Sequence, residues 1–184
     1  MTLSRRSLIT GACSAGTALA LGLTLNLPQA LAAPQTPPPG MDPAAFARDR
    51  FLSHWNCTQA VLEGLGPESG LSAETITRIT TPFAAGMWSG LTCGAVTGAM
   101  MAIGMRFGRS SDGDAAATEA TTAKVRELVT TLGKEFGGLD CSALLGVDMA
   151  TDAGIKEAAS KGLFKSKCPL LVEASVREAA RLMA

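Results

Sequence analysis

An uncharged stretch of 23 residues, from Phe83 to Met105, constrains the fold of this chain more than any other part of it. Its length would allow a transmembrane helix, but five glycines and the polar Ser89, Thr92 and Thr97 make it a poor membrane span. A helix that is apolar on all sides is more often buried inside its own protein. The sequence therefore predicts a buried, glycine-rich central helix surrounded by a helical bundle.

Glycines recur at four-residue steps within this stretch, at Gly90, Gly94 and Gly98, and would form one stripe on a helix. Each glycine costs a helix about 1 kcal/mol relative to alanine, so three in register need a compensating contact. A stripe without side chains lets a neighbouring backbone or a cofactor come close. Gly94 and Gly98 are therefore candidate cofactor-contact residues.

The rest of the chain also has helical patterns, and no segment has the pattern of a strand. Residues 33–43 are rich in proline and are predicted to be a linker. Asp42-Pro43 is typical of a helix start, and the helix that follows is predicted to run from Ala44 to Leu65. Further helical segments are predicted at 72–81, 114–136, 141–146, within 148–167, and from Pro169 onward. The predicted fold is an all-α, single-domain bundle over residues 44–184.

The first 32 residues have the layout of an export signal. Arg5 and Arg6 precede an apolar run over residues 8–27, and residues 30–32 supply the small side chains of a cleavage site. The adjacent arginines match the twin-arginine signal, which bacteria use for a separate export route. An ordinary secretory signal is the alternative. The expected location is the periplasm, with no stable membrane span in the mature protein.

Charge and side-chain chemistry exclude some classes of function. Of the 16 basic residues, Arg5 and Arg6 leave with the signal, whereas all 16 acidic residues stay. A nearly neutral chain without a concentrated basic face gives no reason to expect a nucleic-acid partner. The chain has one histidine and no recognisable serine–histidine–acid triad or carboxylate pair, so it has few side chains suited to catalysing hydrolysis. An electron-transfer or accessory role fits better than an enzyme.

Four of the five cysteines lie beyond the signal: Cys57, Cys93, Cys141 and Cys168. An even number in an oxidising compartment suggests disulfides, and four cysteines allow three pairings. Four thiolates also form a complete ligand set for an iron–sulfur cluster or zinc, and Cu(I) accepts thiolates as well. Cys57 is predicted late in the first helix and Cys93 on the central one. Cys141 and Cys168 are predicted at helix starts, where the helix dipole stabilises a thiolate.

The segments around these cysteines follow a definite order. Asn-Cys-x-Gln-Ala-Val at 56–61 comes first, and Phe-Ala-Ala-Gly-Met at 83–87 leads into Cys-Gly-Ala-Val-Thr-Gly at 93–98. Leu-Asp-Cys-x-x-Leu-Leu-Gly at 139–146 follows, and Cys168 completes the set. This order resembles the C_GCAxxG_C_C family of redox-active proteins. One departure is Ala84-Ala85, where the family pattern leads us to expect glycine before Gly86.

The resemblance implies a small helical protein whose four cysteines act together. A related domain in the split-Soret cytochromes is associated with a two-iron, two-sulfur cluster on four cysteines. Carried over to this chain, the ligands are Cys57, Cys93, Cys141 and Cys168, the glycine stripe gives the cluster room, and the function is electron transfer.

Several alternatives stay open at this point. The cysteines could bind zinc or Cu(I), or form structural or exchanging disulfides without metal. The chain could also be a non-catalytic accessory protein of a membrane transporter or oxidoreductase. His54 lies one helical turn before Cys57 and is a further candidate ligand, although a lone histidine is more often simply packed. The redox partner is not readable from the sequence, and a homodimer that shares one cluster is compatible with it.

Overall fold

The computed structural model describes residues 36–66 and 70–184. The predicted export signal and the first residues of the linker lie outside the described residues. Within those two ranges the regular structure is helical and contains no strand, and a single antiparallel bridge joins Thr92 to Asp140. None of the described helices combines the length and the apolar character needed to cross a membrane. The predicted all-α class is confirmed.

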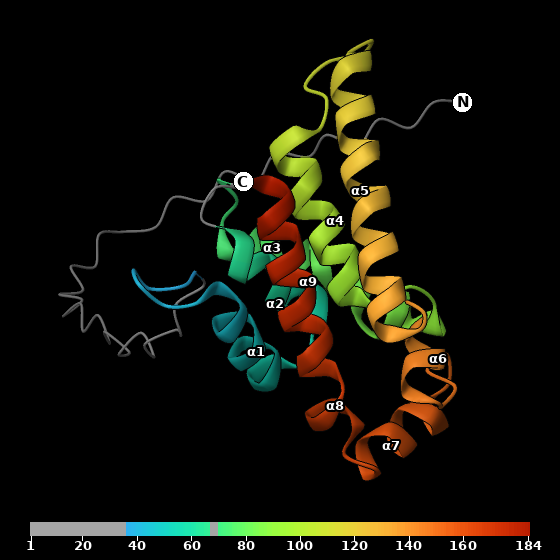
Figure 1. Ribbon diagram of the computed structural model, residues 1–184. Helices are drawn as coiled ribbons and strands as arrows, with labels where there is room; N and C mark the ends of the chain where they lie inside the picture. Colours follow the sequence, from blue (N-terminus) through green and yellow to red (C-terminus); the bar gives the residue numbers. More distant parts are fainter. Residues whose placement is uncertain (1–35, 67–69) are drawn as a thin grey trace, which may run out of the picture. The chain divides into compact units, whose positions relative to one another are not determined.

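The helices follow one another with short connections. They are α1 (Pro43–His54), α2 (Cys57–Leu65), α3 (Ala73–Thr80), α4 (Gly94–Phe107), α5 (Ala115–Phe136), α6 (Cys141–Leu145), α7 (Asp152–Ser160), α8 (Leu163–Ser166) and α9 (Cys168–Met183). A 3-10 turn, η2 (Thr81–Phe83), and an irregular turn, η3 (Gly86–Gly90), lie between α3 and α4. The far ends of α4 and α5 project together beyond the other helices (Figure 1).

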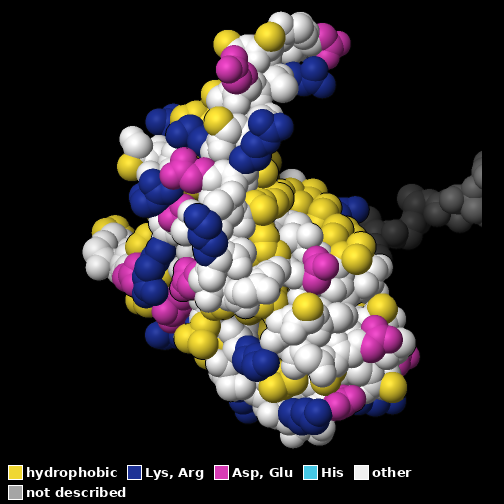
Figure 2. Space-filling view, turned by 45° about the vertical axis from the view of Figure 1, so that its right-hand side comes forward, with side chains coloured by type: hydrophobic (Ala, Val, Ile, Leu, Met, Phe, Trp, Pro, Cys, Tyr) yellow, Lys and Arg dark blue, Asp and Glu magenta, His cyan; other side chains and the backbone are white. Residues whose placement is uncertain are grey.

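Helix α4 occupies the centre of the bundle and packs against α2, α5 and α9. Its inward face is aliphatic, as are the faces that it meets. The side chains buried there include Val96, Ala99 and Ile103 of α4, Val61 and Leu62 of α2, Leu128 and Leu132 of α5, and Val172 and Val176 of α9. Burial of one such side chain stabilises a fold by about 1.5–3 kcal/mol. Figure 2 shows that hydrophobic side chains also gather on the surface beside the projecting end.

The predicted helix starts are confirmed by their caps. The Asp42 carboxylate accepts a hydrogen bond from the Ala44 amide at 3.1 Å, and Ser72 and Asp114 cap α3 and α5 in the same way. Each such cap stabilises its helix by about 1 kcal/mol. Helix α5 ends as predicted at Gly137, which has a φ of 73°.

Two predicted helices are broken, and this corrects the sequence analysis. The helix expected from Ala44 to Leu65 stops at His54, because Trp55 takes a left-handed φ of 60° and Asn56 then caps a new helix. The central helix expected from Phe83 to Met105 begins only at Gly94. In both places the backbone turns left-handed, which a right-handed helix cannot contain.

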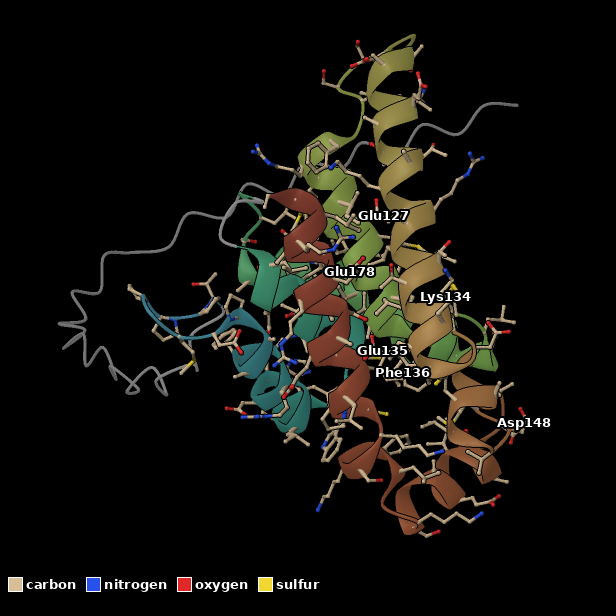
Figure 3. All side chains as sticks on the ribbon, in the orientation of Figure 1. Glu127, Lys134, Glu135, Phe136, Asp148 and Glu178 are labelled. Carbon is tan, nitrogen blue, oxygen red and sulfur yellow. The ribbon has the colours of Figure 1, made fainter. Side chains whose placement is uncertain are left out.

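A surface network of charges joins α5 to α9. The Arg181 guanidinium bridges Glu127 of α5 and Glu178 of α9, with Nη2 at 2.7 Å from Glu178 Oε1. Figure 3 labels Glu127 and Glu178, with Glu178 lower in the view than Glu127. Exposed ion pairs contribute about 0.2–1 kcal/mol each, so this network supports the bundle only modestly.

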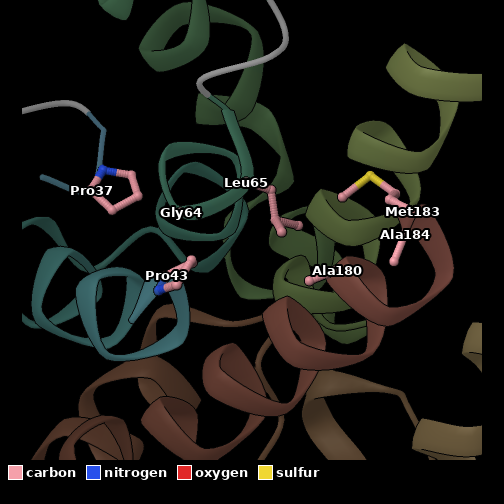
Figure 4. A pocket seen from close by; sticks show the side chains of 7 residues that line it. All are labelled: Pro37, Pro43, Gly64, Leu65, Ala180, Met183 and Ala184. Carbon is pink, nitrogen blue, oxygen red and sulfur yellow. The ribbon is translucent and has the colours of Figure 1, made fainter. Parts of the chain in front are cut away.

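A cavity of about 310 Å³ lies where the linker meets the ends of α2 and α9 (Figure 4). It is lined by Pro37, Pro43, Gly64, Leu65, Ala180, Met183 and Ala184. The cysteines begin these two helices, whereas the cavity lies at the helix ends. It is therefore separate from any site that the cysteines form, and its lining offers no ionisable side chain.

Candidate functional site

Each of the four cysteines stands at the start of a helix. Cys57, Cys141 and Cys168 are the first residues of α2, α6 and α9, and Cys93 directly precedes α4. The starts of α4, α6 and α9 lie at the same end of the bundle (Figure 1). Free amide N–H groups and the helix dipole stabilise negative charge at such positions. The prediction for Cys141 and Cys168 is confirmed. The two helix breaks place Cys57 and Cys93 at helix starts as well, which corrects the sequence analysis.

Two backbone hydrogen bonds hold the segment of Cys93 beside that of Cys141. The Cys93 amide donates to the Leu139 carbonyl at 2.8 Å, and the Cys141 amide donates to the Leu91 carbonyl at 2.7 Å. These bonds flank the antiparallel bridge between residues 92 and 140. Two cysteines that are far apart in the sequence are thereby fixed as neighbours.

Side-chain hydrogen bonds also connect the starts of α9 and α2 to neighbouring segments. The Lys167 ammonium, directly before α9, donates to the Leu144 carbonyl of α6 at 2.9 Å. The Asn56 amide group, directly before α2, donates to the Thr80 carbonyl at 3.1 Å. The starts of α2 and α9 are therefore held by the segments that lead to α4 and form α6.

A hollow of about 170 Å³, here called the cysteine hollow, lies between these helix starts. Three cysteines line it, Cys57, Cys141 and Cys168, and Cys93 is hydrogen-bonded to Cys57. The other lining residues are Phe51, Trp55, Ala84, Ala85, Trp88, Leu145, Met149, Ile155 and Phe164. The hollow exceeds the roughly 30 Å³ that one water occupies. Thiols are the only metal-ligating side chains in its lining apart from the thioether of Met149.

All four cysteines are buried and free of disulfides. A hydrogen bond from the Cys93 thiol lowers the pKa of Cys57, which outweighs the opposing effect of burial. The same bond, together with burial, raises the pKa of Cys93. Burial and the nearby charge of Cys57 raise the pKa of Cys141 to about 12, and both also raise the pKa of Cys168. Cys57 is thus the thiol of the group that loses its proton most readily.

A left-handed turn forms the wall of the hollow next to Cys57. Ala85, Gly86, Met87 and Trp88 have φ values of 52°, 64°, 59° and 54°. This conformation costs a residue other than glycine about 1–2 kcal/mol, and strain of this kind is concentrated at functional sites. The turn directs the Ala85 amide to Cys57, and Trp88 lines the hollow.

Replacing Ala85 by glycine is expected to stabilise the fold by up to about 1 kcal/mol, because glycine adopts a positive φ without steric cost. Urea unfolding of the two proteins measures the difference. Ala84 provides the matched control, since its φ is −61°. Ala84→Gly should destabilise the fold by about 0.5–1 kcal/mol. Effects of the same sign at both positions would contradict this account of the turn.

Gly94 and Gly98 face helix α2. A Cβ atom on Gly94 would lie 2.5 Å from Thr58 Oγ1 and 2.6 Å from Cys57 Sγ, and one on Gly98 would lie 2.9 Å from the Thr58 carbonyl oxygen. The glycine stripe therefore receives a neighbouring backbone. It is shorter than predicted, because Gly90 lies outside α4. Contact of Gly94 and Gly98 with a cofactor stays a prediction.

The single histidine is engaged outside the hollow. His54 Nε2 lies 3.2 Å from Glu63 Oε2, and His54 Nδ1 accepts the Asn56 amide at 3.2 Å. The fully buried Glu63 also accepts hydrogen bonds from Arg50 at 2.6 Å and Gln59 at 2.8 Å. With both ring nitrogens in contact with these partners, His54 supports the turn before α2. Sequence reasoning missed this network, which joins residues of α1 to α2 across the predicted continuous helix.

Within residues 36–66 and 70–184, no three histidine, cysteine or carboxylate side chains are placed together as ligands of one metal ion. Three of the four thiols line the cysteine hollow, and the fourth, that of Cys93, is hydrogen-bonded to Cys57. Sequence reasoning identified all four, although it did not predict which of them touch.

Comparison with known proteins identifies the family. A family model described as "Putative redox-active protein (C_GCAxxG_C_C)" matches residues 55–182. No curated protein and no solved structure matches the chain. The matched region contains all four buried cysteines and both helix breaks that bring them to helix starts. The chain belongs to the C_GCAxxG_C_C family of redox-active proteins.

Proposed function

We propose that this chain is an exported electron-transfer protein that holds one two-iron, two-sulfur cluster on Cys57, Cys93, Cys141 and Cys168. The observation that carries the proposal is the convergence of four buried, free thiols, each at a helix start: three line one hollow, and Cys93 is hydrogen-bonded to Cys57 beside it. Export rests on the predicted signal in the first 32 residues. Twin-arginine export of an already folded protein suits a cofactor that is inserted before transport.

The four cysteine sulfurs, and the distances between them, favour a cluster over a single metal ion. Four cysteine thiolates are the usual ligands of a two-iron, two-sulfur cluster. A single zinc would draw all four sulfurs to about 2.3 Å from one point. Among the described residues, no three ligating side chains lie close enough together to bind one metal ion. A cluster divides its four ligands between two metals, so it fits thiols that surround a hollow.

When bound, the cluster would gain and lose single electrons. The chain contributes the surroundings. The apolar walls of the cysteine hollow exclude water, and the amides of Ala85 and Thr58 hydrogen-bond to the Cys57 sulfur. Hydrogen bonds to a ligand sulfur and burial are the levers that set a cluster potential. Loading requires Cys93, Cys141 and Cys168 to lose their protons, so acidic solution should oppose it.

Single Cys→Ser variants of the four cysteines test the proposal. Each variant, purified without oxygen, is expected to lose most of the visible absorption and the electron paramagnetic resonance signal of the reduced protein. Ser89→Ala, a change in the exposed turn before α4, is the control and should keep both. Four variants that retain the native spectrum would show that the cysteines are not the ligands.

The contact between Cys57 and Cys93 favours a second candidate function, thiol–disulfide exchange. The Cys57 thiolate would attack a disulfide oxidant and release one thiol, and Cys93 would then displace the second. The balance is one protein disulfide formed and one oxidant disulfide reduced to two thiols. Mass spectrometry of metal-free protein treated with oxidised glutathione would detect a Cys57–Cys93 bridge. Formation of this bridge at a rate fast enough for turnover, in protein that never contains iron, would favour the second function.

A further inference from the structure

A groove of about 440 Å³, here called the outer groove, opens beside α7 and α8. It is lined by Trp55, Ala159, Ser160, Gly162, Phe164 and Lys165. Trp55 and Phe164 also line the cysteine hollow, and their ring centroids are 6.4 Å apart. Trp55 is 46% exposed, although it reaches the hollow. The two rings are therefore a shared wall between the surface and the buried thiols.

Lysines border this groove. Lys165 lines it, and Lys156 lies one helical turn before Ala159 and Ser160, on the same face of α7. Lys161 is also exposed, but it is paired with Glu157 at 2.6 Å. Within the described part of the chain, no carboxylate forms an ion pair with Lys156 or Lys165. Residues 152–167 carry four lysines and two carboxylates, so this is a local positive region beside the site.

We propose that the outer groove is the docking surface for an acidic protein that exchanges electrons with the cysteine site. This inference rests on the proposed electron-transfer function. An acidic partner face would be attracted by the lysines, which raises the rate of encounter without requiring a tight complex. Docking there would bring the partner's redox centre against the Trp55 and Phe164 wall. Neither the cavity at the ends of α2 and α9 nor the groove lined by Arg109 and Thr118 shares a lining residue with the cysteine hollow.

The groove shape favours a protein over a lipid surface. A concave groove receives a protruding segment of a partner, whereas a membrane-bound surface inserts protruding apolar side chains along a longer amphipathic helix. Helix α8 has only four residues, and Trp55 is packed edge-on against Phe51 at 5.7 Å.

Two outer-sphere oxidants of opposite charge test the proposal on full-length protein with its cofactor reduced. Tris(oxalato)cobaltate(III) is an anion and hexaamminecobalt(III) is a cation. In each case one electron leaves the protein and reduces Co(III) to Co(II). At low ionic strength, the double variant Lys156→Glu/Lys165→Glu is expected to react about tenfold more slowly with the anion, and faster with the cation. Added salt should reduce both effects.

The matched control carries the same change in net charge elsewhere. Arg109→Glu/Arg126→Glu alters two exposed residues in the α4–α5 loop and on α5, and it should change the two rates by less than about twofold. Equal effects of the two double variants would overturn the proposal. So would binding of the native protein to phosphatidylglycerol vesicles that is lost in Lys156→Glu/Lys165→Glu, because the groove would then be a membrane surface.

Fluorescence quenching separates failure of this proposal from failure of the proposed function. The Trp88→Phe variant leaves Trp55 as the single tryptophan. Iodide should quench Trp55 several-fold more efficiently than caesium, and Lys156→Glu/Lys165→Glu should abolish that preference, whether or not iron is present. If the protein purified without oxygen contains no iron and still shows this preference, the cluster is refuted and the anion-attracting groove is supported. Equal quenching by the two ions would refute the groove.

Discussion

Replacing Gly94 by alanine is expected to lower the free energy of unfolding by about 2–3 kcal/mol and to disrupt the cysteine site. The added Cβ would lie 2.6 Å from Cys57 Sγ and 2.9 Å from the Phe83 carbonyl oxygen. The carbonyl belongs to the backbone of η2, so helix α4 must move away from η2 as well as from the Cys57 side chain of α2 to accept it. Overpacking of a buried contact costs about 1–3 kcal/mol. Urea unfolding and the visible spectrum of the same preparation measure the two effects.

Gly104 is the matched control for this variant. It lies on the same helix, and a Cβ there would meet nothing within 4 Å. Gly104→Ala should therefore stabilise the protein by up to about 1 kcal/mol through helix propensity alone. If Gly94→Ala were as stable as Gly104→Ala and kept the native spectrum, the close packing of α4 on the start of α2 would be wrong.

Replacing Glu63 by glutamine is expected to destabilise the protein by about 3 kcal/mol at neutral pH. Glu63 is fully buried and accepts hydrogen bonds from Arg50, His54 and Gln59. Glutamine keeps the volume but removes the charge that pairs with Arg50, whose side chain is only 12% exposed. Loss of one partner of a buried ion pair costs about 3–5 kcal/mol. Glu157→Gln, in the exposed pair with Lys161, should cost less than about 0.5 kcal/mol.

The pH dependence of this variant gives a sharper test. Burial raises the pKa of Glu63, but the hydrogen bonds from His54, Arg50 and Gln59 outweigh it and bring the pKa to about 2. An unfolded glutamate titrates near pH 4.3. A depressed carboxyl pKa stabilises the fold above the unfolded value, and this stabilisation is lost as the pH falls toward 2. The stability difference between native protein and Glu63→Gln should therefore shrink between about pH 5 and pH 2. A difference that stays constant with pH would assign the effect to shape instead of charge.

Much of the fold was predictable because local signals decide it. Asp42, Ser72 and Asp114 are good caps, and each begins a helix where the sequence predicts one. The central position of α4 followed from the uncharged stretch at 83–105. The break at residues 55–56 had a readable signal, since asparagine followed three residues later by glutamine is typical of a helix start. The helical pattern on both sides of residues 55–56 nevertheless favoured one continuous helix.

The left-handed turn at 85–88 had no such signal. Ala85, Met87 and Trp88 all favour right-handed conformations, so only the surrounding contacts hold them at positive φ. Those contacts include the Leu91 amide on the Gly86 carbonyl at 3.1 Å and the Trp88 indole on the Thr81 carbonyl at 3.0 Å. These tertiary contacts therefore remove eleven residues, 83–93, from the predicted helix and place Cys93 directly before its start.

The candidate site was also predictable in part: the identity of its residues was, and their arrangement was not. The sequence predicted that four cysteines act together, and the structure gathers their helix starts around one hollow. Their arrangement depends on contacts between distant segments, such as the pair of backbone bonds that fixes Cys93 beside Cys141. No spacing along the chain encodes those contacts.

The most direct test of the central claim is the iron and acid-labile sulfide content of the protein purified without oxygen. The account predicts about two irons and two sulfides per chain, lost together in Cys93→Ser. Protein that contains neither iron nor sulfide, and whose four cysteines are found in disulfides, would contradict it.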